Sequence, residues 1–256
     1  MRLFLGSGAV FAAASCCCGL GDEPDAGLTP PPGQARYVVA TPSLTLRSAP
    51  SKEAAELADI PRGEAVVVTG TAEGYEVAAG IRGGWAPVWY AGKQGYAFDG
   101  FLFPWPPPPP GCSSLKAWAG SLERVGAPVT TQSPQCQNPE QEVECSEDTR
   151  TNLVNGAWMH ENTGWEWGSD TLHFPGVGRD VLWAAARACF TGAPDLHLLP
   201  LPTQAGPVPS IKAEFGEVRA IVEPDRAGWE WEEGCSAYLY VIGVGADSEI
   251  VSGGGC

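Results

Sequence analysis

The stretch SLTLRSAPS, residues 43–51, sets the fold expected for the first part of the chain. Leu44 and Leu46 alternate with Thr45 and Arg47. In a β-strand, alternate side chains point to the same face, so the two leucines lie on one face and the polar pair on the other. The serine, alanine and proline that follow favour a turn. We therefore predict a half-buried strand that leads directly into a turn.

Further short apolar or alternating segments occur between residues 36 and 103. Turns rich in Gly, Pro and Ser separate them, a pattern typical of small all-β barrels. The segments are RYVVA (36–40), AVVVTG (65–70), YEVAAG (75–80), WAPVWYAG (85–92) and GYAFDGFLF (95–103). The 33 glycines and 24 prolines of the chain also favour many turns over long helices. The sequence predicts a small barrel over residues 36–103.

In their order, these segments resemble the bacterial SH3-like domain found in exported proteins. That family shows a Leu-x-Leu/Val-Arg-Ser-x-Pro opening, a Lys/Arg-Gly pair, a tryptophan strand, a Gly-Lys-x-Gly turn and a closing aromatic strand. The matching residues are Leu44, Leu46, Arg47, Ser48, Pro50, Ile60, Arg62, Gly63, Trp85, Val88, Gly92, Lys93, Gly95, Tyr96 and Leu102. Tyr96 stands where the family usually has Trp. Residues 71–84 exceed the usual loop, which predicts an extra hairpin or extended loop beside any groove.

The resemblance implies a binding module for cell-wall peptide or glycan, or for an envelope protein. SH3-like folds usually take extended peptides in an apolar cleft lined by aromatic side chains. The aromatic candidates are Tyr75, Trp85, Trp89 and Tyr96. Strand alternation prevents all four from lining one groove, so some of them belong to the core.

The N-terminal segment MRLFLGSGAVFAAAS, residues 1–15, has the layout of a secretory signal peptide. Its apolar stretch is too short to span a bilayer as a mature helix. Small residues directly before Cys16 resemble a bacterial lipoprotein cleavage site, although Ala13 stands where Leu is usual. We expect export to the bacterial cell envelope and lipidation of Cys16, with a plain secretory signal as the alternative. The lipid anchor is the expected membrane contact, and residues 16–35 form a flexible tether.

Export gives the distal cysteines an oxidising compartment, which favours disulfides. Sequence alone does not choose among the 15 pairings that six cysteines allow. The candidates are Cys112, Cys136, Cys145, Cys189, Cys235 and Cys256. Zinc is the competing interpretation, but the chain has no C-x-x-C or H-E-x-x-H motif and its three histidines are far apart. We expect no metal and no cofactor, and we expect Cys256 to hold the C-terminus in place.

Residues 104–111, PWPPPPPG, form the next boundary, because consecutive prolines favour an extended spacer over a helix or central strand. Beyond it, residues 113–125 and 179–190 have apolar residues at helical spacing, and residues 196–201, 210–223 and 237–244 read as strands. The predicted fold class is therefore two-domain: a small all-β SH3-like barrel followed by a disulfide-bonded α+β domain of unknown family over residues 112–256.

Two motifs raise the alternative of a cell-wall hydrolase. GCSSLKAW, residues 111–118, faintly resembles the nucleophile segment of papain-like cell-wall endopeptidases, which implies a Cys112 thiolate, but Gly111 replaces the usual Asp. GWEW occurs at residues 164–167 and 228–231, and its glutamates, Glu166 and Glu230, are candidates for a sugar platform or a glycosidase pair. The competing interpretation of GWEW is that two hairpins of one sheet bury matching aromatic rows.

The charge of the chain excludes some partners. With 30 acidic residues against 15 basic ones, the net charge is −15, and such a surface repels phosphate backbones and anionic lipid headgroups. We therefore expect no nucleic-acid partner. Because neither enzymatic motif is complete, we predict a non-catalytic binding protein.

Overall fold

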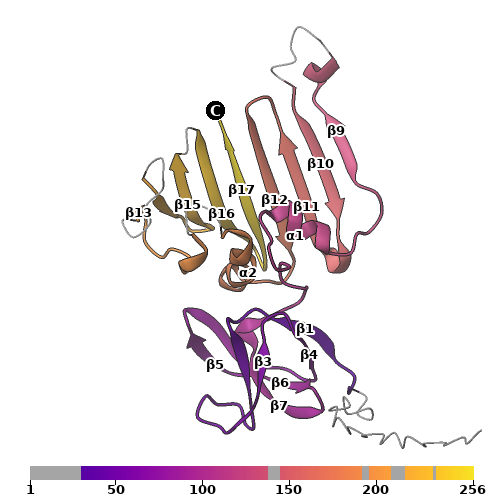
Figure 1. Ribbon diagram of the computed structural model, residues 1–256, viewed down its shortest axis with the longest axis vertical. Helices are drawn as coiled ribbons and strands as arrows, with labels where there is room; N and C mark the ends of the chain where they lie inside the picture. Colours follow the sequence, from indigo (N-terminus) through magenta and orange to yellow (C-terminus); the bar gives the residue numbers. More distant parts are fainter. Residues whose placement is uncertain (1–29, 138–144, 192–195, 209–216, 233–234) are drawn as a thin grey trace, which may run out of the picture.

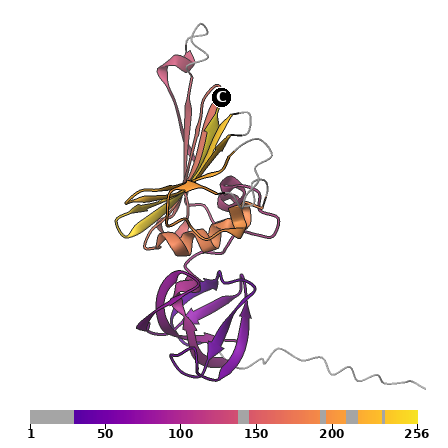
Figure 2. The ribbon, with the colours of Figure 1, turned by 90° about the vertical axis from the view of Figure 1, so that its left-hand side faces the viewer.

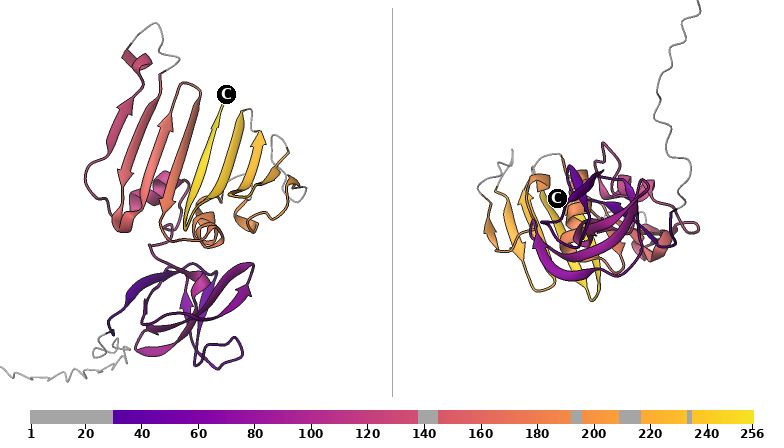
Figure 3. Two further views of the ribbon diagram at one scale, coloured as in Figure 1. Left: turned by 180° about the vertical axis from the view of Figure 1, so that it is seen from behind. Right: turned by 90° about the horizontal axis from the view of Figure 1, so that it is seen from below.

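The computed structural model describes residues 30–137, 145–191, 196–208, 217–232 and 235–256. The predicted signal peptide, Cys16 and most of the tether lie outside the described residues. The described residues are mostly β, with 49% strand and 15% helix. They form two antiparallel sheets, which lie one above the other in Figure 1 and, seen from behind, in the left view of Figure 3. Among the described residues, no helix is long and apolar enough to cross a membrane.

The first sheet runs in the order β3-β2-β7-β6-β4-β1-β8, and β5 pairs with β6 beside this path. Its strands are β1 (Gln34–Val38), β2 (Ser43–Arg47), β3 (Glu56–Pro61), β4 (Ala65–Val68), β5 (Glu73–Ala78), β6 (Ile81–Tyr90), β7 (Lys93–Phe98) and β8 (Leu102–Phe103). The strand predicted from SLTLR is confirmed as β2. The first strand begins two residues before the predicted boundary at residue 36, and β3 was not predicted from the sequence.

Leu44 and Leu46 of β2 are buried, as their alternation predicted, and they contribute to a core with Ile60 and Val88. The first sheet curls round this core (Figure 2). Within the described residues, however, β3 and β8 at the two ends of the path do not pair with each other. The prediction of a closed barrel is therefore wrong: β8 has only two residues, and both pair with β1.

The second sheet runs in the order β13-β14-β15-β16-β17-β12-β11-β10-β9. Its strands are β9 (Val129–Gln132), β10 (Glu147–Asn152), β11 (Trp158–Thr163), β12 (Trp167–Phe174), β13 (Gly206–Pro207), β14 (Arg219–Val222), β15 (Arg226–Glu232), β16 (Ser236–Val244) and β17 (Asp247–Gly255). On one face, Leu172 lies opposite Ile250, and Ile250 lies opposite Val241. All three are fully buried, so this face carries the core.

Two short helices pack against the second sheet, α1 (Leu115–Ser121) and α2 (Arg179–Ala186), as Figure 2 shows. Both lie in segments whose spacing predicted helices. Ser114 caps α1 by accepting a hydrogen bond from the backbone N–H of Ala117. The strand predicted over residues 196–201 is wrong, since Leu196–Leu198 form a 3₁₀ turn. Pro200 follows two residues after this turn, and proline lacks the N–H that a strand ladder needs.

An aromatic cluster connects the proline segment to the second sheet. Trp105 is 2% exposed, and its ring centroid lies 5.7 Å from that of Phe103 and 4.9 Å from that of Phe174. The Trp105 indole N–H donates to the Val154 carbonyl at 2.9 Å, and that of Trp118 donates to the Pro106 carbonyl at 3.1 Å. The segment predicted as a spacer is thus anchored at its start. A single hydrophobic cluster includes Val39 and Ile81 of the first sheet region together with the core of the second.

Arg62, which follows β3, forms a second connection. One guanidinium nitrogen donates to the carbonyls of Val39 and Ala184, and the other donates to the Ala185 carbonyl at 2.9 Å. The two alanines belong to the last turn of α2, whose carbonyls lack helical partners and favour a cation. Burial, and next the charge of Arg187, lower the pKa of the Arg62 guanidinium. Arg62, the arginine of the predicted Arg-Gly pair, therefore caps α2, the helix that packs against the second sheet.

We expect Arg62→Ala to lower the free energy of unfolding by about 1.5–3 kcal/mol, the range for hydrogen bonds to charged groups. Urea unfolding followed by circular dichroism measures the change. Arg82→Ala is the matched control, because Arg82 is exposed on β6, and its cost is expected within about 0.5 kcal/mol. Equal costs for the two variants would contradict the role of Arg62.

Candidate ligand-binding cleft

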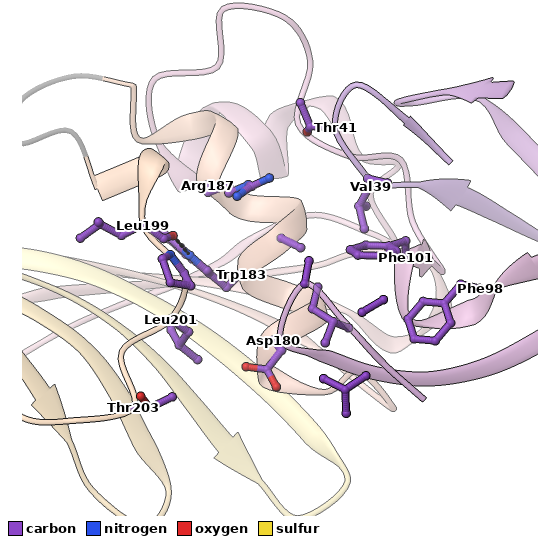
Figure 4. A pocket seen from close by; sticks show the side chains of 18 of the residues that line it. Val39, Thr41, Phe98, Phe101, Asp180, Trp183, Arg187, Leu199, Leu201 and Thr203 are labelled. Atoms are coloured by element: carbon purple, nitrogen blue, oxygen red, sulfur yellow. Dashed lines mark hydrogen bonds between the residues drawn. The ribbon is translucent and has the colours of Figure 1, made fainter. Parts of the chain in front are cut away.

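A cleft of about 970 Å³ lies between the first sheet and α2. Ligand sites in proteins commonly have volumes of about 300–1,000 Å³. Figure 4 shows Phe98 and Phe101 on one side, facing Trp183, Leu199 and Leu201 on the other. The walls thus come from segments about a hundred residues apart in the sequence.

Trp183 of α2 organises the second wall. Its side chain is 3% exposed, and its ring centroid lies 4.9 Å from that of Trp229 on β15. The indole N–H donates to the Leu199 carbonyl at 2.9 Å, which fixes the segment that carries Leu198. Leu198 lines the cleft and is 68% exposed. An exposed leucine beside buried tryptophans offers apolar contact area to a ligand.

The edge strand β5 borders the cleft with its last residues. Within the described residues, β5 pairs with β6 alone, so one row of its backbone N–H and C=O groups has no partner strand. Five consecutive residues of this strand and its turn, residues 76–80, line the cleft. Ile81 at the start of β6 lines it too, so the turn end of the β5–β6 hairpin borders the cleft and places the last residues of the edge strand β5 beside it. A free edge of this kind accepts an added extended peptide.

The charges of the cleft differ from those of the whole chain. Three cationic and two acidic side chains line it, although acids outnumber bases twofold in the sequence. These side chains are Arg47, Lys52, Arg187, Glu76 and Asp180. Arg47 is already engaged, since it donates to the Ala54 carbonyl at 2.8 Å and lies 3.4 Å from Glu56. The remaining lining charges balance, two cationic and two acidic, so the cleft lacks the acid excess of the whole chain.

The predicted ligand-binding aromatics do not form one group. Trp85 lines the cleft but is only 6% exposed, and its indole N–H has no hydrogen-bond partner among the described residues. Tyr75 is 68% exposed on β5, while Trp89 and Tyr96 are half-buried on β6 and β7. These three do not line the cleft. Residues 71–84 include β5 and the start of β6, which form the hairpin beside the cleft.

No sequence pattern predicted the second wall of the cleft. Trp183 and Leu199 come from segments that were predicted only as a helix and a strand. Their role depends on the packing of α2 against the first sheet, which no local pattern encodes. The apolar pair Leu198 and Leu199 directly before Pro200 is the one local sequence feature that could have drawn attention to this segment.

All six distal cysteines form disulfides, as predicted. The Cα atoms of Cys112 and Cys189 lie 4.6 Å apart, and the other pairs are separated by 4.5 Å and 4.8 Å. The other two pairs are Cys136–Cys145 and Cys235–Cys256. The second of these ties the last residue of the chain to the start of β16. The Cys112 disulfide removes the thiolate that a papain-like mechanism needs.

The two GWEW motifs occupy different environments. The first lies at the turn between β11 and β12, where Trp165 is 61% and Trp167 49% exposed, whereas Trp229 of the second is 1% exposed within β15. The interpretation of two matching buried rows is therefore wrong. Glu230 lies in register with Ser169 of β12, three strands away or about 14 Å at the usual strand spacing. Glu166 lies in the turn directly before β12. The two carboxylates of a glycosidase lie within about 9.5 Å of each other, so the positions of Glu166 and Glu230 do not fit a glycosidase pair.

Within the described parts of the chain, no group of three or more His, Cys, Asp and Glu side chains is arranged to hold a metal ion. A second, smaller cleft of about 400 Å³ lies near Arg36, Asp99 and Val181. This smaller cleft lacks the aromatic side chains that form the walls of the larger cleft. The larger cleft is therefore the candidate site. A scan against protein-family models finds no match to the sequence, and comparisons with curated proteins and with solved structures find none either.

Proposed function

We propose that this chain is a non-catalytic binding protein of the bacterial cell envelope that takes an extended cell-wall peptide into the cleft between its two sheets. The observation that carries the proposal is the cleft itself, which has apolar walls and a free strand edge. Main-chain hydrogen bonds to β5 supply affinity for any extended peptide, and the apolar walls select its side chains.

The proposal includes an SH3-like first domain, export and lipidation at Cys16. The sequence motifs of residues 36–103 support the first of these, together with the short antiparallel strands that curl round one core. The three disulfides support an oxidising compartment. The N-terminal segment supports export and the anchor on the basis of the sequence alone.

We expect Leu198→Ser to weaken the binding of cell-wall peptides by about tenfold or more, because burial of a leucine side chain contributes about 1.5–3 kcal/mol. Calorimetric titration with peptides released from purified bacterial cell wall by an amidase measures the affinity. The unfolding free energy should change by less than about 0.5 kcal/mol, since Leu198 is 68% exposed.

Val129→Ser is the matched control for this experiment. Val129 is 61% exposed on β9, outside the cleft, and its replacement is expected to leave affinity unchanged. If the wild-type protein neither sediments with purified cell wall nor binds the released peptides, the proposed function is wrong. An equal loss in both variants would show that the ligand does not use the cleft.

A further inference from the structure

Two charged side chains lie at opposite ends of the cleft wall formed by α2. Asp180 is in the first turn of the helix, and Arg187 directly follows its last residue. Both line the cleft, and Figure 4 shows Arg187 toward the end that carries Thr41, with Asp180 toward the other end. Among the described residues, neither side chain forms an ion pair. The wall is therefore positive at one end and negative at the other.

The spacing of these charges corresponds to a short peptide. Asp180 and Arg187 are seven positions apart along α2 and the turn that continues it. At a rise of about 1.5 Å per residue, this separation is about 10 Å along the helix axis. An extended chain spans about 3.3–3.4 Å per residue, so about three residues bridge the two charges.

The helix dipole alone does not account for Arg187. A cation at a helix C-terminus and an anion at the N-terminus both stabilise the helix. However, Arg62 already donates to the carbonyls of Ala184 and Ala185 in the last turn of α2. Arg187 adds a second positive charge beside Arg62, and this charge contributes to the lowered pKa of the Arg62 guanidinium. An anion bound at Arg187 would relieve this repulsion.

We propose that the cleft recognises both charged groups of a short peptide, with its free carboxylate on Arg187 and its free ammonium on Asp180. This inference rests on the proposed function and names the ligand class within it. An amide cross-link in the wall consumes one amine and one carboxyl group. The two groups come from different peptides, so each linked peptide lacks one of the two charges, and the cleft favours a peptide that keeps both.

The test compares three forms of the peptides released from purified cell wall by an amidase: unmodified, amidated at their carboxyl groups, and acetylated at their amines. Calorimetric titration of the wild-type protein should give at least about tenfold tighter binding of the unmodified form than of either derivative. Arg187→Gln should abolish the preference over the amidated form and keep the preference over the acetylated one. Asp180→Asn should do the reverse.

The matched controls are Arg219→Gln and Asp225→Asn, two exposed side chains that do not line the cleft. Both should keep both preferences. Equal affinity of the wild-type protein for all three forms overturns this inference and leaves the proposed function standing. If Arg187→Gln retains the full preference over the amidated form, this inference is likewise overturned and the proposed function stands. If the wild-type protein binds none of the three forms, the proposed function itself fails.

Discussion

Trp105→Ala is expected to lower the free energy of unfolding by about 3–5 kcal/mol, the range for removal of a large buried aromatic side chain. The indole is 2% exposed, contacts Phe103 and Phe174, and donates a hydrogen bond to the Val154 carbonyl. The substitution leaves a cavity and removes one of the two hydrogen bonds that the Val154 carbonyl accepts at the connection between the two sheets. Urea unfolding, followed by both tryptophan fluorescence and circular dichroism, measures the loss.

Trp165→Ala provides the matched control, because the same atoms are removed from a side chain that is 61% exposed. Its cost is expected to stay within about 0.5 kcal/mol. A cost for Trp105→Ala that is as small as the control would mean that the proline segment is not anchored by this residue. Two separate transitions in the wild-type protein would argue against a core shared by both sheets.

The second large effect concerns the disulfides. We expect removal of the Cys112–Cys189 disulfide by a double alanine substitution to cost about 4.5 kcal/mol, because it closes a loop of 77 residues and loop entropy grows with length. Removal of Cys136–Cys145, with a sequence separation of 9, should cost about 2.6 kcal/mol. Urea unfolding of both double variants under non-reducing conditions measures the difference.

The comparison controls for the loss of a disulfide as such, since each double variant lacks one pair and keeps two. Cys112 and Cys189 are also buried, so truncation to alanine adds a small packing loss in the same direction. A larger cost for the short loop than for the long one would contradict the loop-length argument.

Local patterns predicted much of the secondary structure. The alternation of Leu44 and Leu46 identified β2, and a serine before an apolar spacing identified α1, because these features depend only on neighbouring residues. The prediction failed at Leu196–Leu198, where an apolar stretch resembled a strand. A nearby proline and the packing of this segment under α2 decided its conformation instead.

The candidate site was less predictable, and the GWEW motifs explain why. Trp165 and Trp229 occupy the same position in identical tetrapeptides, yet one is 61% and the other 1% exposed. The first lies at a hairpin turn and the second within a strand covered by α2. Burial is thus determined by the location of a residue in the sheet, which depends on long-range pairing. The same holds for Trp85, where the sequence indicated an aromatic but not the cleft that it lines.

The hydrophobic cluster that runs from Val39 through Phe103 and Trp105 into the second sheet has a consequence for how this protein can be divided or recombined. A gene fragment that ends at the proline run would leave apolar side chains of the first sheet uncovered, and the complementary fragment would lack Trp105. Neither half is therefore a transferable unit, and an exchange that moved the first sheet onto another protein would have to carry a matching surface with it.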